Sequence, residues 1–556
     1  MRFILQNHQE KACLRDTLRL FFSRLEICEE GFQGPLYAVS PAYQGLDLVI
    51  TSTLCRPLSL EALRGREEAP PVTVTTRLIP QGALVEPDLP QGALVEPECT
   101  VPDLAEGQTK SLWQVSQTVP SADVRRELKR QAYFALSELT GISWPWGSLT
   151  GVRPSQVAAQ LIDSGLEPPL LAQTLQERFA LDPLKATKLV QVTLAEQAIL
   201  ATLPSEDYLV YLGVPFCPGR CAYCSFIAQD ASRFADQLGD YARALAREIQ
   251  LVGQELAGQG QVAALYMGGG TPTSLSAADL DLVLSSARRY LPLRPDAELT
   301  VEAGRADTLD RGKLQVMQDQ GIGRLCINPQ TLQDRTLKRI GRRHTVAQVY
   351  NAFDLARQTG FDDINMDLIL GLPGEDPQDF ADSLSQVLGL APASLTIHSL
   401  AFKRSAYLFD QFQNLSQGDN KDLDPALGDK LDPDPAQHPA QDLQAQLLLP
   451  APAWLNALNQ AEEDLREAGY EAYYLYRQKQ VISGLENTGY AQAGQACAYN
   501  VGMMSDQRQV IGLGAGAASK RLKDGHLDRL YNSKDLGEYM AKIETIARKK
   551  AQFFLG

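Results

Sequence analysis

Cys217, Cys221 and Cys224 form the one clustered group among the nine cysteines of the chain. They lie in the stretch VYLGVPFCPGRCAYCSF with C-x3-C-x2-C spacing, directly after an apolar run typical of a strand. Thiolates are the usual protein ligands of iron-sulfur clusters, and three of them leave one iron of a cubane without a protein ligand. The spacing therefore predicts a [4Fe–4S] cluster with one iron open for chemistry.

Two simpler interpretations of the three cysteines stay open at this point, a zinc site and a set of reduced core cysteines. Zinc usually favours paired C-x2-C units with a second pair, or a pair of histidines, elsewhere in the chain. His344, His398, Cys326 and Cys497 are isolated from one another in the sequence. This pattern favours the cluster. The nine cysteines are an odd and mostly scattered set, which does not resemble a secreted disulfide framework.

Six short apolar segments, separated by amphipathic helical ones, must position these cysteines. Such alternation predicts an α/β fold with a parallel sheet, and in parallel β/α barrels the functional groups lie at the carboxyl ends of the strands. Each segment is followed at once by Gly, Pro, Cys or polar residues. The expected strands cover residues 208–214, 262–267, 298–303, 324–329, 363–370 and 394–400.

The rest of the chain divides into regions of different composition. We expect a mixed α/β region at residues 1–205, the barrel at 206–411, an Asp- and Pro-rich linker or insertion at 412–452, and an appended domain at 453–556 that covers the substrate. Within the first region, PQGALVEPDL is followed at once by PQGALVEPEC, a near repeat at residues 80–99. Two copies are too few for a solenoid, so we interpret the repeat as a surface insertion.

The formal charge of −15 arises from 52 basic and 67 acidic residues. Broad attraction to nucleic acid or to anionic lipid is therefore not expected. The amino terminus lacks the apolar core and the cleavage site of a secretory signal, and no apolar run is long enough to span a bilayer. We expect a cytoplasmic protein with no membrane partner.

The cysteine loop resembles the signature of the radical S-adenosylmethionine (SAM) superfamily, in which the amino and carboxylate groups of SAM bind the open iron. Within it the chain resembles the oxygen-independent coproporphyrinogen III oxidase (dehydrogenase) family, in its HemZ-like branch. The matching motifs in the barrel are GGGTPT (268–273), Glu302, INPQTL (327–332), IGRRH (340–344) and NMDLILGLPGE (365–375). Outside it they are LTGVRPS (149–155), YRQK (476–479) and GLENTGY (484–490).

The resemblance implies a partial (β/α)6 radical SAM barrel with an appended C-terminal HemN-type domain, and it assigns residues to two SAM sites. Tyr211, Gly269 and Glu302 match positions that contact the SAM at the cluster. No catalytic residue is assigned. The positions that match a second SAM site are Tyr223, Gly270, Thr271, Gln330, Arg342, Asp367 and Ala401.

Two positions depart from the family pattern. Gly213 stands where many members have a histidine, and Phe226 stands where they have a further cysteine two residues after the third ligand. In these features the loop resembles the HemZ and haem-chaperone (HemW) branches more than the dehydrogenases.

The implied activity is oxidative decarboxylation of two propionates of coproporphyrinogen III to vinyl groups, which gives protoporphyrinogen IX in haem biosynthesis. The implied partner besides the substrate is a flavodoxin- or ferredoxin-type electron donor. A substrate with four carboxylates needs basic side chains near the barrel mouth. The candidates are Lys403, Arg404, Arg343, Arg477 and Lys479.

Three other functions are weighed against this one. A haem-binding or haem-transfer protein on the same scaffold would need an axial ligand, for which His344, His398 and Cys326 are candidates. Another radical SAM enzyme acting on a tetrapyrrole, such as a methylase or a ring-opening enzyme, would carry the same core motifs. A structural iron-sulfur or RNA-binding role finds little support in the acidic balance of the chain.

Overall fold

The structure of the chain is a computed structural model that describes residues 2–6, 11–19, 26–27, 31–33, 48–55, 72–80, 113–119, 123–226, 229–401, 403, 406, 452–479, 481–523 and 526–555. Apart from Pro80 and Pro452, the repeat at 80–99 and the segment 412–452 lie outside the described residues. The described residues form two compact units. The first takes in those of Met1–Gly151 and Glu167–Thr187, and the second those of Val152–Leu166, Lys188–Leu447 and Ala451–Gly556.

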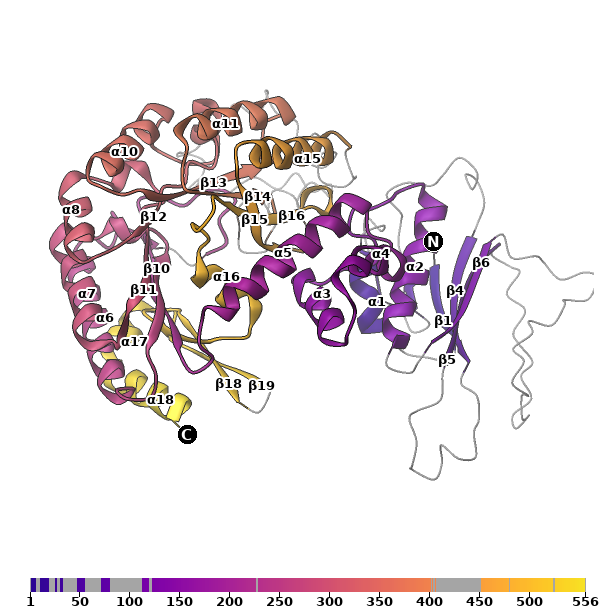
Figure 1. Cartoon of the computed structure of the whole chain (residues 1–556), viewed down its shortest axis with the longest axis horizontal. Helices are drawn as coiled ribbons and strands as arrows, with labels where there is room; N and C mark the ends of the chain where they lie inside the picture. The colour runs from indigo at the N-terminus through magenta and orange to yellow at the C-terminus, as the bar shows by residue number, and fades with distance from the viewer. Residues whose placement is uncertain are drawn as a thin grey trace, which may run out of the picture. The chain divides into compact units, whose positions relative to one another are not determined.

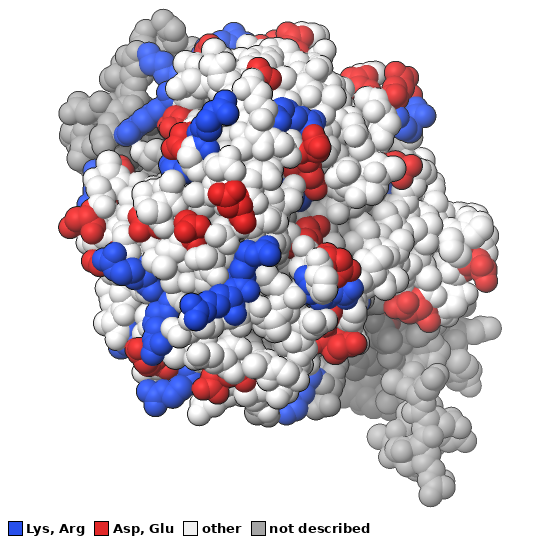
Figure 2. Space-filling model, turned by 60° about the vertical axis from the view of Figure 1, so that its left-hand side comes forward, with Lys and Arg blue, Asp and Glu red and all other residues white. Residues whose placement is uncertain are grey.

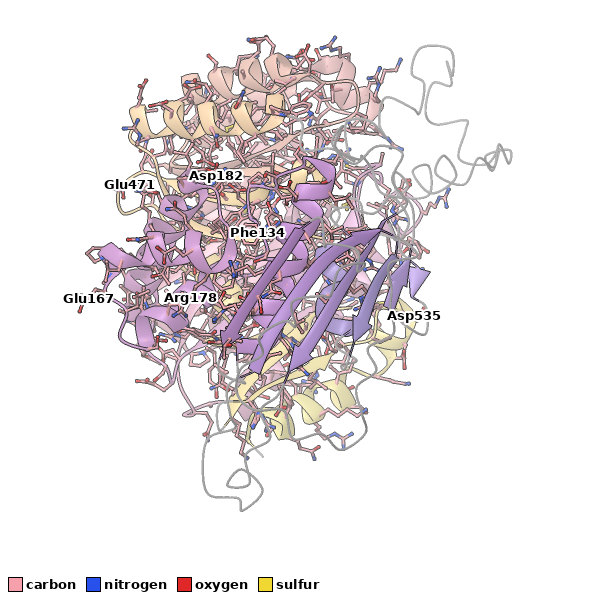
Figure 3. All side chains as sticks on the ribbon, turned by 90° about the vertical axis from the view of Figure 1, so that its right-hand side faces the viewer. Phe134, Glu167, Arg178, Asp182, Glu471 and Asp535 are labelled. Carbon is pink, nitrogen blue, oxygen red and sulfur yellow. The ribbon has the colours of Figure 1, made fainter. Side chains whose placement is uncertain are left out.

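The first unit contains a six-stranded sheet with the order β2-β3-β1-β4-β5-β6, whose strands Figure 3 shows side by side. Helix α2 packs on β5 through Leu128, Ala132 and Leu136, which are fully buried at four-residue spacing on one helix face. This arrangement confirms the mixed α/β character expected for the region. Its elements are β1 (Arg2–Gln6), α1 (Lys11–Leu18), β2 (Glu26–Ile27), β3 (Gly31–Gln33), β4 (Leu48–Cys55), β5 (Val72–Pro80), β6 (Trp113–Val119), α2 (Val124–Thr140) and α4 (Pro168–Phe179).

The second unit is built on an eleven-stranded sheet with the order β15-β16-β14-β13-β12-β11-β10-β7-β17-β18-β19. Its centre consists of six parallel strands in sequence order, and these are the six that the sequence predicts. The partial (β/α)6 barrel is therefore confirmed. The strands are β7 (Tyr208–Val214), β10 (Val262–Gly269), β11 (Leu293–Glu302), β12 (Arg324–Cys326), β13 (Asp363–Leu370) and β14 (Ser394–Ser399).

Alternate residues of these strands face opposite sides of the sheet. Val210 and Leu212 of β7 pack in the core beneath the outer helices. Leu209 and Tyr211 lie on the opposite, inner side with Tyr266 of β10. Figure 1 shows helices α6, α7, α8, α10 and α11 arranged around the outside of the strands. The inner side, which we call the barrel lumen, therefore receives every second side chain of each strand.

The outer helices begin where the sequence supplies capping groups. Ser276 accepts a hydrogen bond from the Asp279 amide before α7, and Thr345 forms a capping box before α10. Figure 2 shows Lys and Arg interspersed with Asp and Glu on the face that carries these helices, as on an ordinary solvated surface. The helices between the barrel strands are α6 (Leu238–Glu255), α7 (Ala277–Tyr290), α8 (Arg311–Asp319), α9 (Asp334–Arg339), α10 (Val346–Gln358) and α11 (Pro377–Leu390). Two helices precede the barrel, α3 (Pro154–Asp163) and α5 (Pro183–Ala201), and the residues of α5 up to Thr187 belong to the first unit.

Residues after 452 contribute to both edges of the barrel sheet. Strands β15 (Glu471–Arg477) and β16 (Glu486–Ala491) extend it antiparallel beyond β14. Strand β17 (Gln509–Leu513), which the sequence analysis did not anticipate, pairs parallel with β7 and is followed by β18 (Ala518–Lys523) and β19 (His526–Tyr531). The remaining helices are α15 (Pro452–Glu467), α16 (Ala498–Ser505), α17 (Leu536–Ala541) and α18 (Ile543–Leu555). None of the helices formed by the described residues is both long and apolar enough to cross a membrane.

Candidate functional site

The three clustered cysteines lie on a loop that backbone hydrogen bonds tie to the barrel. Cys217 ends the short strand β8 (Phe216–Cys217), which pairs with β9 (Gln229–Asp230). The amide of Cys224 donates to the Cys221 carbonyl at 3.0 Å, and the amide of Ala222 donates to the Ile340 carbonyl at 3.0 Å. Burial raises the pKa of Cys217 to about 11, and the nearby Cys221 and Cys224 contribute to the rise. The fold thus gathers the three thiols on one loop.

The surroundings of the thiols fit an anionic cluster. The guanidinium of Arg305, which is buried, lies 3.7 Å from the Cys221 Sγ. The Thr271 hydroxyl lies 3.4 Å from the Cys217 Sγ. Within the described part of the chain, no three His, Cys, Asp or Glu side chains are grouped as ligands of a single metal ion. A cubane is larger than one ion, so its cysteine ligands lie further apart than those of a single metal ion. Three sulfur donors beside the buried cation of Arg305 therefore suit a negatively charged cluster.

The glycine-rich turn after β10 packs directly against the cysteine loop. The amide of Gly270 donates to the Val214 carbonyl at 2.8 Å, and the amide of Thr271 donates to the Phe216 carbonyl at 2.7 Å. A Cβ on Gly270 would lie 2.5 Å from that Phe216 oxygen, and Gly269 has φ +116°. Both positions therefore require glycine, which lets the backbone of the turn lie against the cluster loop.

Tyr211, Gly269 and Glu302, the residues predicted to contact the SAM at the cluster, lie together. The Glu302 carboxylate accepts a hydrogen bond from the Gly269 amide at 3.3 Å and another from the Tyr266 hydroxyl at 2.7 Å. The Tyr211 hydroxyl lies 3.2 Å from the point where a Cβ on Gly269 would stand. Burial, with a smaller contribution from the Asp367 charge, raises the pKa of Glu302 to about 7. The Glu302 carboxyl group can therefore lose its proton and bind a cationic or hydrogen-bond-donating ligand group near neutral pH.

Arg342 and Tyr223, both predicted for the second SAM site, form one group beside the cluster loop. Arg342 is buried, and its Nη1 donates to the carbonyls of Asn328 at 2.5 Å and Gly304 at 3.0 Å. Its Nη2 donates to the Tyr223 hydroxyl at 3.2 Å. Arg342 is thus a fixed interior cation at the strand ends and not an ordinary surface arginine.

Gln330 follows β12, Asp367 lies within β13, and Ala401 follows β14. Gln330 has the left-handed φ of 70°, a conformation that in a non-glycine residue commonly marks a functional position. Its backbone amide donates to the Asp367 carbonyl at 2.9 Å. Ala401 forms a bridge with Val481. The seven residues predicted for the second site therefore lie on or after neighbouring strands, with Gly270 and Thr271 in the glycine-rich turn.

Several buried polar atoms near these groups have no hydrogen-bond partner among the described residues. They are the Gln330 Oε1, the Asn328 Oδ1, the Arg342 Nε and one Nη of Arg305. Because an unpaired buried polar atom is costly, such a set is typical of a site that binds a polar ligand. The residues present therefore fit SAM bound at a cluster.

Further residues in the lumen were not singled out for the SAM sites. Tyr266 bridges Glu302 and Cys326, with its hydroxyl 3.7 Å from the Cys326 Sγ. Tyr499, from α16, stacks on Tyr266 with ring centroids 4.8 Å apart. Residues two apart on a strand face the same side of the sheet, so Tyr266 shares the side of Gly268, the first glycine of GGGTPT. This alternation is the signal that could have placed Tyr266 in the lumen.

The three candidate haem ligands already have partners in the structure. His344 is buried, with its Nδ1 3.3 Å from Asp307. His398 has its Nε2 3.5 Å from Asp367 and its Nδ1 3.3 Å from the Tyr476 hydroxyl. Cys326 is buried beside Tyr266. Haem ligation by any of them would require these contacts to break.

The candidate carboxylate-binding residues differ in their surroundings. The Lys403 ammonium lies 5.6 Å from the centroid of the Phe226 ring, and burial lowers its pKa while the nearby Cys224 opposes that change. Arg477 is buried and donates to the Gly484 carbonyl, which indicates a structural role. Arg343 and Lys479 are exposed, and Arg404 lies outside the described residues. Lys403 and Arg343 are thus the basic candidates beside the cluster loop, with the Arg343 Nε 3.7 Å from the point where a Cβ on Gly219 would stand.

Gly213, where many family members have histidine, faces the same side of β7 as Tyr211. A Cβ there would lie 3.3 Å from the Tyr211 ring and 3.4 Å from the Leu513 carbonyl oxygen of β17. Strand β17 and the Tyr211 ring therefore leave little room for a larger residue at this position.

Comparisons with known proteins agree with this site. Residues 211–387 match the model of the radical SAM superfamily. The chain is 34% identical over 420 residues to the oxygen-independent coproporphyrinogen-III oxidase-like protein HemZ of Bacillus subtilis (strain 168), covering 74% of this chain and 78% of that protein. It is 32% identical over 205 residues to the heme chaperone HemW of the same organism, covering 36% of this chain and 53% of that protein.

Among solved structures, the chain is similar to the radical SAM enzyme coproporphyrinogen III oxidase (HemN) from Escherichia coli. The identity is 23% and the TM-score 0.44, and the match covers 63% of this chain and 72% of that one. Together with the match to HemZ along most of both sequences, the superfamily match over the cysteine loop and barrel decides the family. The chain belongs to the radical SAM superfamily and, within it, to the HemZ-like branch of the oxygen-independent coproporphyrinogen III oxidase family.

Proposed function

We propose that the chain is an oxygen-independent coproporphyrinogen III dehydrogenase that uses a [4Fe–4S] cluster on Cys217, Cys221 and Cys224. When bound, the cluster and SAM would supply a 5′-deoxyadenosyl radical able to remove a hydrogen atom from the β-carbon of a propionate. Loss of carbon dioxide, with one electron passed to an external one-electron acceptor, would leave a vinyl group, and two such events would give protoporphyrinogen IX. Family membership supports the class of chemistry, and the residues around the cluster support the substrate class.

One observation carries the substrate class: a cationic and an aromatic side chain lie together beside the third cysteine. The Lys403 ammonium lies against the ring of Phe226, which is 65% exposed. An ammonium group suits a propionate carboxylate, and an exposed ring suits the face of a pyrrole. Lys403 would hold a carboxylate at the barrel mouth, while the ring of Phe226 would contact the macrocycle.

Residues of the lumen would orient SAM and exclude water. Glu302, Gly269 and Tyr211 would contact the SAM bound at the cluster, with Glu302 in its ionised form. Tyr223, Gly270, Thr271, Gln330, Arg342, Asp367 and Ala401 would contact a second SAM. Aromatic side chains such as Tyr266 and Tyr499 keep water from the reacting centre. We further propose a cytoplasmic location and a flavodoxin- or ferredoxin-type electron donor, with strands from residues 453–556 covering the substrate.

The test is an anaerobic assay of the protein reconstituted with iron and sulfide. Dithionite, SAM and coproporphyrinogen III are added, and the tetrapyrrole mass and 5′-deoxyadenosine are followed together. Stepwise loss of carboxyl groups matched to 5′-deoxyadenosine supports the proposal. Cys221→Ala should abolish both products, whereas Cys497→Ala, which changes a buried cysteine at the start of α16, should keep both.

Haem transfer is the second candidate, and Gly213 and Phe226 favour it because both depart from the dehydrogenase pattern. Under this alternative, 5′-deoxyadenosine would appear with coproporphyrinogen untouched, and haem would bind tightly. A methylase or ring-opening enzyme would instead change the tetrapyrrole mass without loss of carboxyl groups. The same assay therefore separates the three.

A further inference from the structure

Three side chains from β13, β14 and β15 contact one another in series in the lumen, and the proposed function does not yet use His398 or Tyr476. The Asp367 Oδ2 of β13 lies 3.5 Å from the His398 Nε2 of β14. The His398 Nδ1 lies 3.3 Å from the hydroxyl of Tyr476, which is on β15 within the YRQK motif. Their side chains are partly exposed, His398 by 25% and Asp367 by 15%, so the chain borders open space and is not sealed in the core.

The protonation states of these three side chains follow from Asp367. Burial raises the pKa of Asp367, but the contacts with His398, Asn365 and Thr396 together outweigh burial and keep this pKa below its usual value. The ionised carboxylate can only accept hydrogen bonds. A neutral His398 that turns its protonated Nε2 toward this carboxylate has Nδ1 as an acceptor. Nδ1 accepts from Tyr476, whose phenol stays protonated because burial raises its pKa to about 12. Asp367 thereby fixes the direction in which Tyr476 donates.

This direction leaves the Tyr476 oxygen as an acceptor toward the lumen. A phenol oxygen can accept a hydrogen bond while its O–H donates, and the Gln478 Nε2 lies 3.5 Å away, at the outer limit of hydrogen-bond distance. Nearby, the Asp367 charge contributes to the raised pKa of Glu302, so two carboxyl groups face this part of the lumen. An acceptor-rich, acidic surface repels propionates and favours N–H donors.

We propose that Tyr476 accepts a hydrogen bond from a pyrrole N–H of the substrate, and that His398 and Asp367 are positioning residues for its hydroxyl. The inference rests on the proposed function for the identity of the tetrapyrrole. A porphyrinogen carries four pyrrole N–H groups, whereas the nitrogens of haem are bound to iron and carry none. Tyr476 would therefore select metal-free tetrapyrroles over haem, with propionates directed to Lys403 at the mouth.

Equilibrium ultrafiltration of the reconstituted protein measures this selection without turnover. The ligands are coproporphyrinogen III, oxidised to porphyrin afterwards for quantitation, and haem. Tyr476→Phe should raise the Kd for coproporphyrinogen about fivefold, the usual effect of one lost neutral hydrogen bond, and leave the Kd for haem unchanged. Tyr531→Phe is the matched control, because Tyr531 is 63% exposed on β19, and it should change neither value.

A double-mutant cycle tests the positioning role. His398→Gln should weaken coproporphyrinogen binding as Tyr476→Phe does, and the double variant should be no weaker than either single one, because His398 acts through Tyr476. A packing role would instead give additive losses on both ligands and would overturn the inference.

Three further outcomes are distinguishable. Should wild-type protein decarboxylate coproporphyrinogen while Tyr476→Phe binds it unchanged, the inference fails and the proposed function stands. Should wild-type protein bind haem but no coproporphyrinogen, both fail. Should Tyr476→Phe weaken porphyrinogen binding while His398→Gln leaves it intact, the positioning role of His398 and Asp367 is refuted.

Discussion

Relative to wild type, Glu302→Gln should lower the stability of the folded protein at acidic pH and raise it at alkaline pH. In the folded protein the pKa of Glu302 is raised from 4.5 to about 7, chiefly by burial. A rise of that size corresponds to about 3 kcal/mol. Because the folded protein binds this proton more tightly than the unfolded chain, wild-type stability falls as pH rises through this range. A glutamine at this position does not titrate, so the variant lacks that fall.

The substitution also removes one acceptor. Glutamine can still accept from the Tyr266 hydroxyl, but its amide nitrogen cannot accept from the Gly269 amide, a loss of about 1 kcal/mol. Near pH 8 the variant should therefore be about 2 kcal/mol more stable than wild type, and near pH 4.5 about 1 kcal/mol less stable. At neutral pH its SAM affinity should fall roughly tenfold or more, because a hydrogen bond to a charged group is lost.

The assay is urea denaturation of the cluster-free protein across this pH range, together with equilibrium dialysis of SAM on the reconstituted protein. Glu375→Gln is a matched control, because burial also raises the pKa of Glu375 to about 7 and its carboxylate accepts from the Thr331 hydroxyl at 2.5 Å. It should show the same pH-dependent gain and bind SAM normally. Parallel pH profiles for wild type and Glu302→Gln would refute the reasoning.

Three further predictions concern other parts of the second unit. Lys550→Met leaves Glu248 charged and buried without its partner 2.6 Å away. The free energy of unfolding, measured in denaturant, should fall by about 3–5 kcal/mol, and a fall of less than about 1 kcal/mol would contradict this. Gly270→Ala should lower the iron content after reconstitution because the new Cβ meets the backbone of β8, whereas Gly389→Ala, in open space, should not. Lys403→Gln should raise the KM for coproporphyrinogen about tenfold with SAM affinity intact, and an unchanged KM would exclude a carboxylate contact.

Much of the central barrel could be predicted because its signals are local. Each of the six strands is a short apolar run next to a Gly, Pro, Cys or polar residue, and the spacing of Cys217, Cys221 and Cys224 is readable within eight residues of sequence. Strand β17 could not be found this way. Its five residues QVIGL lie almost 300 residues after β7, and only the folded sheet shows that they pair.

The contacts of the lumen were also beyond sequence reasoning. Tyr476 meets His398 because β16 pairs with both β14 and β15, an order that the sequence does not follow. Arg305 lies on no strand, yet its guanidinium lies against Cys221. Such contacts depend on sheet order and loop path, which composition and periodicity do not specify.

The central claim is that this site removes a hydrogen atom from a porphyrinogen propionate. Coproporphyrinogen III deuterated at the propionate β-carbons, incubated with reduced, reconstituted protein and SAM, tests it most directly by the mass of the 5′-deoxyadenosine. The account predicts 5′-deoxyadenosine carrying one deuterium, in step with loss of carboxyl groups, and neither product with Cys221→Ala. Unlabelled 5′-deoxyadenosine with intact coproporphyrinogen would contradict the claim.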